Sequence, residues 1–171
     1  MKNFKEDLVK IKAFAFDVDG VLSRTVETMW NDGQPMRTAN IKDGYALQLA
    51  IKLGYKIAII TGGNTQAIQN RYSALGITDI FMGQSSKKEV YQQWRNSNHL
   101  ADDEIMYMGD DMPDIPVLRA VGMPVCPADA CADVKQVVRY VSPFNGGECC
   151  VRDVIEQVLR AQDKWGCDLN W

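Results

Sequence analysis

Histidine and paired cysteines are scarce in this sequence. It contains one histidine, His99, and five cysteines, none of which is spaced as CxxC from another. Zinc sites are usually built from such cysteine and histidine pairs, so we do not expect zinc. The cysteines are an odd number gathered in the last third of the chain, and we interpret them as reduced thiols that pack as small apolar side chains. They are Cys126, Cys131, Cys149, Cys150 and Cys167.

Long apolar runs and a surplus of basic charge are also lacking. No stretch is long enough to span a bilayer, and the N-terminal MKNFKEDLVKIK lacks the apolar core of a signal peptide. We therefore expect a cytoplasmic protein with no membrane partner. The net charge is −3 and the basic residues are scattered, which argues against a nucleic-acid partner. With 171 residues, of which 46% are hydrophobic, the chain is expected to form one domain, 1–171.

Strand-like and helix-like segments alternate along the chain. Apolar runs that end in polar residues and glycine predict strands at 11–16, 55–60 and 105–108, and shorter strands are predicted at 79–83, 122–127 and 139–143. Helices are predicted at about 43–53, 64–75, 86–98, 112–121 and 129–137. This alternation indicates the α/β class: a single Rossmann-like, doubly wound parallel sheet flanked by helices.

Two further segments lie outside this alternation. The turn signal NDG between two extended stretches predicts a protruding β-hairpin at about 25–40. A C-terminal helix and tail are predicted over about 148–171, because apolar residues recur there along one helical stripe. These residues are Val151, Val154, Ile155, Val158 and Leu159.

Acidic residues collect where two of the predicted strands end. Asp17 and Asp19 follow the first strand, and Asp110, Asp111 and Asp114 follow the strand at 105–108. The carboxyl ends of parallel strands meet at one rim of the sheet, so we expect these carboxylates to lie close together. Their mutual repulsion would raise their pKa values unless a cation is bound. Ligands that are all oxygen suit Mg²⁺.

Groups that can bind an anion reach the same rim. Thr61 ends another strand, and the backbone N–H groups of Gly62 and Gly63 at the expected start of a helix are suitable donors for a tetrahedral anion. A lysine would complete the set, and the stretch QSSKKEV offers Lys87 or Lys88. The combination predicts a site for a phosphorylated ligand.

The four motifs, in this order, resemble those of the haloacid dehalogenase superfamily of phosphotransferases: DVDG at 17–20, TGG at 61–63, Lys87, and GDDMPD at 109–114. The resemblance implies that Asp17 attacks phosphorus and forms an aspartyl-phosphate, while Asp19 donates and then accepts the proton. It also implies that Mg²⁺ is held by the side chains of Asp17 and Asp110 and by the backbone carbonyl of Asp19. Thr61 and Lys87 would bind the phosphoryl group. Asp111 and Asp114 are assigned to the surroundings of the metal, as contacts to its ligands or waters.

The intervals between the motifs leave no room for an inserted cap domain. The chain is similar, over nearly its full length, to the capless 3-deoxy-D-manno-octulosonate 8-phosphate (KDO8P) phosphatases. That resemblance implies a homotetramer in which hairpins associate and each active site is completed by a neighbouring subunit. It also implies that Arg71 binds a sugar-acid carboxylate, with Lys42 and Arg152 as weaker candidates. The matching stretches include NIKDGYALQLA, AIITGGNTQAIQNRYSALGI, YMGDDMPDIPVL and GGECCVRDVIEQVLRAQDKW.

The chain departs from its relatives at three positions that bear on function. Cys149 replaces the glycine that these phosphatases carry after the residue matching Glu148. Related phosphatases of 2-keto-3-deoxynononate 9-phosphate carry Glu where this chain has Gly63, and Lys where it has Ala74. The loss of both polar contacts favours the eight-carbon substrate, and the nine-carbon substrate is the alternative.

A signalling receiver domain is an alternative from another class, since it also uses clustered acids, a Thr and a Lys. In receivers, however, the acidic pair lies on the first strand and the phosphate acceptor on a middle one. Here the DxD motif is on the first strand and the acidic pair comes after the lysine. The order of the motifs therefore favours a phosphatase.

Overall fold

The computed structural model describes residues 4–166. A six-stranded sheet runs through it in the order β3-β2-β1-β4-β5-β6, with every neighbouring pair parallel. Strand β1 is central, and the chain winds outward from it in both directions, so the expected doubly wound α/β fold is confirmed. The strands are β1 Ala13–Phe16, β2 Lys56–Ile60, β3 Asp79–Phe81, β4 Ile105–Met108, β5 Met123–Cys126 and β6 Tyr140–Val141.

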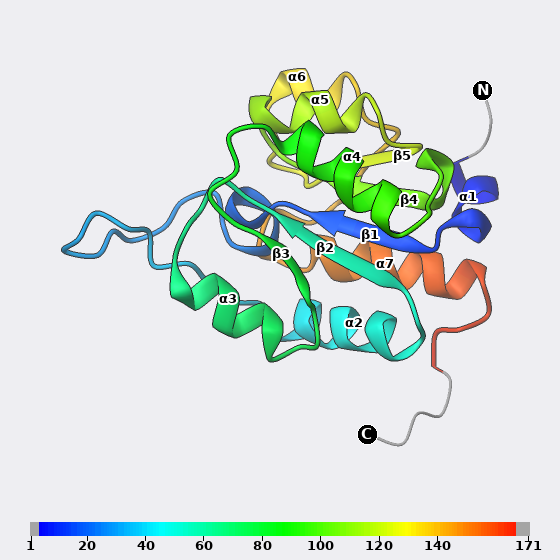
Figure 1. Cartoon of the computed structure of the whole chain (residues 1–171), viewed down its shortest axis with the longest axis horizontal. Helices are drawn as coiled ribbons and strands as arrows, with labels where there is room; N and C mark the ends of the chain where they lie inside the picture. The colour runs from blue at the N-terminus through cyan, green and yellow to red at the C-terminus, as the bar shows by residue number, and fades with distance from the viewer. Residues whose placement is uncertain (1–3, 167–171) are drawn as a thin grey trace.

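Helices cover both faces of this sheet (Figure 1). One face carries α2 Ile41–Lys52, α3 Gln66–Ser73 and α7 Cys150–Ala161, and the other carries α4 Lys87–Ser97, α5 Ile115–Leu118 and α6 Ala132–Lys135. The chain enters through α1 Phe4–Asp7 and the 3₁₀ turn Leu8–Lys10, which the sequence pattern did not predict. Further 3₁₀ turns span Asp102–Glu104 and Met112–Asp114.

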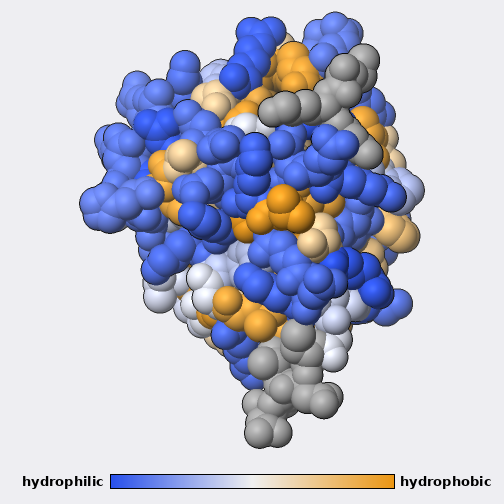
Figure 2. All heavy atoms as spheres, turned by 90° about the vertical axis from the view of Figure 1, so that its right-hand side faces the viewer, coloured by the Kyte–Doolittle hydropathy of each residue, from blue (hydrophilic) through white to orange (hydrophobic). Residues whose placement is uncertain are grey.

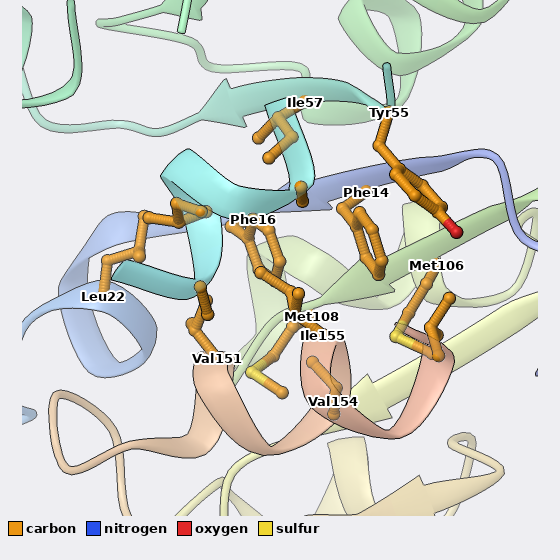
Figure 3. Close-up of a cluster of buried hydrophobic side chains, with 14 of the residues drawn as sticks. Phe14, Phe16, Leu22, Tyr55, Ile57, Met106, Met108, Val151, Val154 and Ile155 are labelled. Carbon is orange, nitrogen blue, oxygen red and sulfur yellow. The ribbon is translucent and has the colours of Figure 1, made fainter. Parts of the chain in front are cut away.

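Alternating side chains of the strands separate the core into two layers. Phe14 and Phe16 point toward α2 and α7 and lie among the buried side chains of those helices (Figure 3). Ala13 and Ala15 point the other way, toward the buried aromatic rings of α4. Each fully buried large apolar side chain contributes about 1.5–3 kcal/mol. Both faces of β1 are therefore sealed, and only its carboxyl end remains open for polar groups.

The predicted helix at 112–121 is wrong in its extent. The chain there forms the 3₁₀ turn Met112–Asp114 and then the single helical turn α5. Pro113 and Pro116 lack backbone N–H groups, and a regular helix cannot be propagated through two such positions so close together. The helix predicted at 129–137 is also shorter than expected, since only α6, Ala132–Lys135, forms within it.

The segment predicted to form a β-hairpin, residues 25–40, projects as an arm from the end of the sheet where the strands terminate (Figure 1). It folds back on itself through a single antiparallel bridge between Met29 and Pro35, flanked by hydrogen bonds from Trp30 N to Gln34 O at 2.8 Å and from Met36 N to Thr28 O at 2.7 Å. Pro35 has no N–H to donate, which limits any longer ladder. The arm is therefore a loop whose two limbs pair at a single bridge near the tip, and it does not form a pair of regular strands.

The opposite end of the molecule, where the strands begin, faces the viewer in Figure 2. Hydrophilic residues cover most of this face, and hydrophobic residues appear in small separate patches. Within residues 4–166, no helix combines the length and apolar character that crossing a membrane requires.

Candidate active site

Asp17 is the first residue after β1 and is buried at the floor of a hollow. Its backbone N–H donates to Met108 O at 3.1 Å, which ties it to the end of β4. Its side-chain Oδ1 accepts a hydrogen bond from Val18 N at 2.7 Å. The other oxygen, Oδ2, lies 2.6 Å from Nζ of Lys87. Two groups thus hold the carboxylate in one orientation, and a third fixes the backbone of Asp17.

Lys87, not Lys88, is the lysine of the site. It is the first residue of α4 and is buried, whereas Lys88 is exposed. Its Nζ also lies 2.8 Å from Oδ1 of Asp114, so it bridges two carboxylates. Burial opposes the charge on Lys87, but the charges of Asp17 and Asp114 outweigh that effect and raise its pKa. The ammonium group therefore stays protonated inside the hollow.

Asp114 has a structural role that its assignment near the metal did not capture. It is fully buried, and its Oδ1 accepts from Tyr107 OH at 2.6 Å as well as from Lys87. Its Oδ2 accepts from the backbone N–H groups of Asp110 at 3.0 Å and Asp111 at 3.3 Å. Asp114 therefore fixes the loop that follows β4 and, with it, the position of Asp110.

Carboxylates converge closely enough to hold a metal ion. Oxygen atoms of Asp17, Asp110 and Asp114 lie within 4.8 Å of one another. Burial, together with the charge of Asp114, raises the pKa of Asp17 to about 7. Burial, together with Asp17 and Asp114, raises the pKa of Asp110 to about 8. A divalent cation would relieve this repulsion, and the donor set of oxygens fits Mg²⁺.

The backbone of the DxD loop lies against the same cluster. Gly20 has a φ of +81°, and a Cβ at this position would lie 2.0 Å from Oδ2 of Asp110. Only glycine allows so close an approach. The Asp19–Gly20 backbone is therefore beside the Asp110 carboxylate, which suits the expected use of the Asp19 carbonyl as a metal ligand.

Thr61 directly follows β2 and is buried at the wall of the hollow. Its Oγ1 accepts a hydrogen bond from Gly63 N at 3.0 Å. The expectation that Gly62 and Gly63 begin a helix is wrong, because α3 begins at Gln66. The two glycines instead form a loop, and one of the two expected backbone donors is already occupied by Thr61.

One hollow of about 530 Å³ brings the expected residues together. Its lining contains Asp17, Asp19, Thr61, Gly62, Gly63, Lys87, Asp110, Asp111 and Asp114. The sequence pattern did not single out Thr25, Gln84 and Ser85, which also line it. Gln84 and Ser85 belong to the stretch QSSKKEV that offered the lysine, which was the available signal, whereas Thr25 follows no predicted strand and belongs to none of the four motifs.

The residues expected to bind a sugar-acid carboxylate lie elsewhere. Arg71 lines a separate hollow of about 150 Å³ beside Tyr72. Lys42 and Arg152 line another hollow, of about 450 Å³, along α7. Within one chain, therefore, these three residues do not join the acidic cluster.

Arg37 was missed by the sequence analysis and lies directly at the site. It comes from the arm, and its Nε and Nη2 donate to the two carboxylate oxygens of Asp19 at 2.7 and 2.8 Å. The arm has no periodic pattern, so the only available signal was an arginine between the first motif and the first helix.

Comparisons with known proteins agree with this geometry. Residues 73–149 match the family described as haloacid dehalogenase-like hydrolase. The 3-deoxy-D-manno-octulosonate 8-phosphate phosphatase KdsC of Yersinia pestis is 36% identical over 154 residues, which cover 90% of this chain and 82% of that protein. The KdsC protein of Escherichia coli strain K12 is also 36% identical over 154 residues, with the same coverage.

Solved structures show the same relationship. The crystal structure of the Yersinia pestis phosphatase has a TM-score of 0.91 and 34% identity, covering 95% of this chain and 88% of that one. The phosphatase of Moraxella catarrhalis, in complex with magnesium, phosphate and KDO, has a TM-score of 0.91 and 30% identity, covering 96% of this chain and 95% of that one. The chain therefore belongs to the KdsC family of haloacid dehalogenase-like phosphatases.

Proposed function

We propose that this protein is a Mg²⁺-dependent phosphatase that hydrolyses 3-deoxy-D-manno-octulosonate 8-phosphate to KDO and phosphate. The observation that carries the proposal is the buried Lys87 ammonium between Asp17 and Asp114, beside the carboxylate of Asp110. This arrangement combines a fixed carboxylate nucleophile with positive charge for a phosphoryl group. The assignment of this sugar acid as the substrate rests on the names and substrates of the similar proteins.

In the first step, a carboxylate oxygen of Asp17 attacks phosphorus and the bond to the sugar oxygen breaks. Asp19 gives its proton to that oxygen, so the sugar leaves as an alcohol. Lys87 and the Thr61 hydroxyl bind the phosphoryl oxygens while negative charge shifts among these oxygens during the transfer. The products of this step are KDO and an aspartyl-phosphate on Asp17.

In the second step, Asp19 takes a proton from water, and the resulting hydroxide attacks the same phosphorus. The bond to Asp17 breaks, phosphate leaves, and both side chains return to their initial states. The side chains of Asp17 and Asp110 and the carbonyl of Asp19 would hold Mg²⁺. When bound, this ion neutralises charge between the carboxylates and the phosphoryl oxygens.

The proposal includes a homotetramer whose active sites are completed by neighbouring subunits. The arm exposes Val26, Met29 and Trp30, whose exposed fractions are 84%, 70% and 58%. Exposed apolar side chains clustered on a projecting segment are typical of an interface. Arg71, which does not join the acidic cluster of its own chain, would then bind substrate in the active site of a neighbouring subunit. Light scattering of the wild type and of Trp30→Ser tests this, because a wild-type monomer would refute the assembly.

The proposal also places the enzyme in the cytoplasm. Cys126, Cys131, Cys149 and Cys150 form no disulfide within residues 4–166, which suits a reducing compartment. Cys167 lies outside the described residues. Fractionation of cells that produce the protein would test this location.

A substrate panel tests the reaction and the substrate separately. KDO8P, 2-keto-3-deoxynononate 9-phosphate and simple hexose phosphates are compared with and without Mg²⁺, with Asp17→Asn as the inactive control. We expect KDO8P to have the highest kcat/KM and every activity to require Mg²⁺. If hexose phosphates equal both keto acids, the substrate assignment fails and the reaction type remains. Slow hydrolysis of its own aspartyl-phosphate, without turnover of any ester, would instead favour a receiver domain.

A further inference from the structure

The acid–base residue of the site is held by a residue of the arm. Arg37 donates from Nε to Oδ1 of Asp19 at 2.7 Å and from Nη2 to Oδ2 at 2.8 Å. Two parallel hydrogen bonds between a guanidinium and a carboxylate fix the plane of both groups. Each oxygen of Asp19 keeps a further lone pair for a proton or a substrate atom.

Arg37 is the anchored member of this pair. Its side chain is 10% exposed, whereas that of Asp19 is 46% exposed. Its Nη1 donates to Oγ1 of Thr65 at 3.3 Å. The guanidinium also lies over Gly63, where a Cβ would come within 2.7 Å of Nη2. These contacts leave Arg37 little freedom, so it determines the position of the more exposed Asp19.

The residue next to Arg37 anchors the arm to the body of the protein. Thr38 N donates to Oγ of Ser23 at 2.9 Å, and Thr38 Oγ1 donates to Oε1 of Glu27 at 2.8 Å. Ser23 Oγ donates to the same Glu27 oxygen at 3.0 Å. This network ties the backbone beside Arg37 to Ser23, whose own N–H donates to Val18 O of the DxD loop at 2.8 Å.

We propose that Arg37 is a positioning residue that holds the Asp19 carboxylate at the rim of the hollow in the rotamer used for proton transfer. An aspartate that is nearly half exposed would otherwise exchange between staggered rotamers, and only one of them would face the leaving oxygen. The arm thereby contributes to catalysis within its own subunit. This inference rests on the proposed function, since it assigns a partner to the acid–base residue of that reaction.

Leaving-group dependence separates positioning of Asp19 from a general structural role. In single-turnover experiments with Mg²⁺, release of p-nitrophenol from p-nitrophenyl phosphate needs no proton donor, whereas release of a sugar alcohol does. We expect Arg37→Met to slow sugar release from KDO8P about 10–100-fold, with KM changed less than about threefold, and to leave p-nitrophenol release nearly unchanged. Arg37→Lys, which keeps the charge without the two-pronged geometry, should be intermediate.

Arg24→Met is the matched control, because Arg24 is an exposed arginine at the base of the same arm. It should behave as the wild type with both substrates. Asp19→Asn and the double variant Arg37→Met/Asp19→Asn complete a mutant cycle. If Arg37 acts through Asp19, the double variant will be no slower than Asp19→Asn alone.

Three outcomes would overturn the inference: wild-type rates in Arg37→Met, equal losses with both leaving groups, or additive losses in the double variant. If Arg37→Met does not fold, Arg37→Lys is subjected to the same comparison. Failure of the proposed function is distinct, because the wild type would then hydrolyse neither ester in the presence of Mg²⁺.

Discussion

Lys87 and Asp17 form a buried ion pair with 2.6 Å between Nζ and Oδ2. One residue begins a helix and the other follows the central strand, and 69 positions separate them in the chain. The proposed mechanism assigns to this ammonium group the stabilisation of negative charge on the phosphoryl oxygens during transfer.

Replacing Lys87 by Met should reduce kcat about 10²–10³-fold, because the transition state loses a fixed positive charge. Lys88→Met is the matched control, since this neighbouring lysine is exposed and should leave kcat unchanged. Steady-state kinetics of both variants in saturating Mg²⁺ provide the measurement. Equal effects of the two substitutions would contradict the role given to Lys87.

Mg²⁺ should stabilise the protein through the acidic cluster. A ligand that binds only the folded state raises Tm in a concentration-dependent manner. We expect Mg²⁺ to raise Tm by several degrees and chelation to abolish activity. Asp110→Asn should lose most of this rise, whereas Asp103→Asn should retain it, because the Asp103 side chain is 65% exposed and lies outside the cluster. A Tm that does not respond to Mg²⁺ would argue against a metal at this position.

Asp43 should make folding stability depend on pH. It is 2% exposed, its Oδ2 has no hydrogen-bond partner, and burial raises its pKa to about 6. Because the unfolded group titrates near pH 3.9, the folded state binds more protons between about pH 4 and pH 6. The contribution of Asp43 to stability is therefore present below pH 4 and is lost as pH rises through 6.

The measurement compares wild type and Asp43→Asn by urea unfolding from pH 4.5 to 7.5 at one Mg²⁺ concentration. The wild type should lose stability relative to the variant as pH rises, and the difference should level off above about pH 7. A constant difference across this range would show that Asp43 titrates alike in both states.

Cys149 should be less favourable than glycine at its position. Its φ is +82°, in the left-handed region that non-glycine residues avoid. We expect Cys149→Gly to stabilise the protein by about 0.5–1 kcal/mol, after the greater entropy of glycine in the unfolded chain is included. Cys131→Gly is the control. Cys131 has a φ of −62°, so glycine at this position should destabilise the protein. The sign of each change in stability is read from the midpoints of urea unfolding, compared between proteins with equal m-values.

Much of the site follows from the sequence because strand ends are easily recognised. Asp17 and Thr61 come directly after apolar runs and Asp110 comes one glycine after another, and a parallel sheet brings such positions to one rim. The register agrees, since Phe16 lies beside Ile59 on one side and Met108 on the other. The fold and the convergence of these residues in one hollow were predictable for this reason.

Other parts depend on contacts that no local pattern encodes. The pairing of Arg37 with Asp19 requires the arm to bend back over Gly63, and that bend is set by tertiary hydrogen bonds. One of the hydrogen bonds that Asp114 accepts, from Lys87, also comes from a distant segment, whereas its other donors lie nearby in the chain at residues 107–111. The prolines that interrupt the helix predicted at 112–121, by contrast, are visible in the sequence, and they preclude a regular helix there.

The shared register of the three central strands determines where the chain can change its length. One residue inserted within β1, β2 or β4 would move the following polar residue by about 3.3 Å and turn it to the opposite face of the sheet. The length of the arm tip is not constrained by strand register in this way. The two limbs of the arm pair with each other at one bridge only, and this bridge lies outside the sheet. Natural variants of this protein should therefore gain and lose residues at the arm tip while the lengths of these strands stay constant.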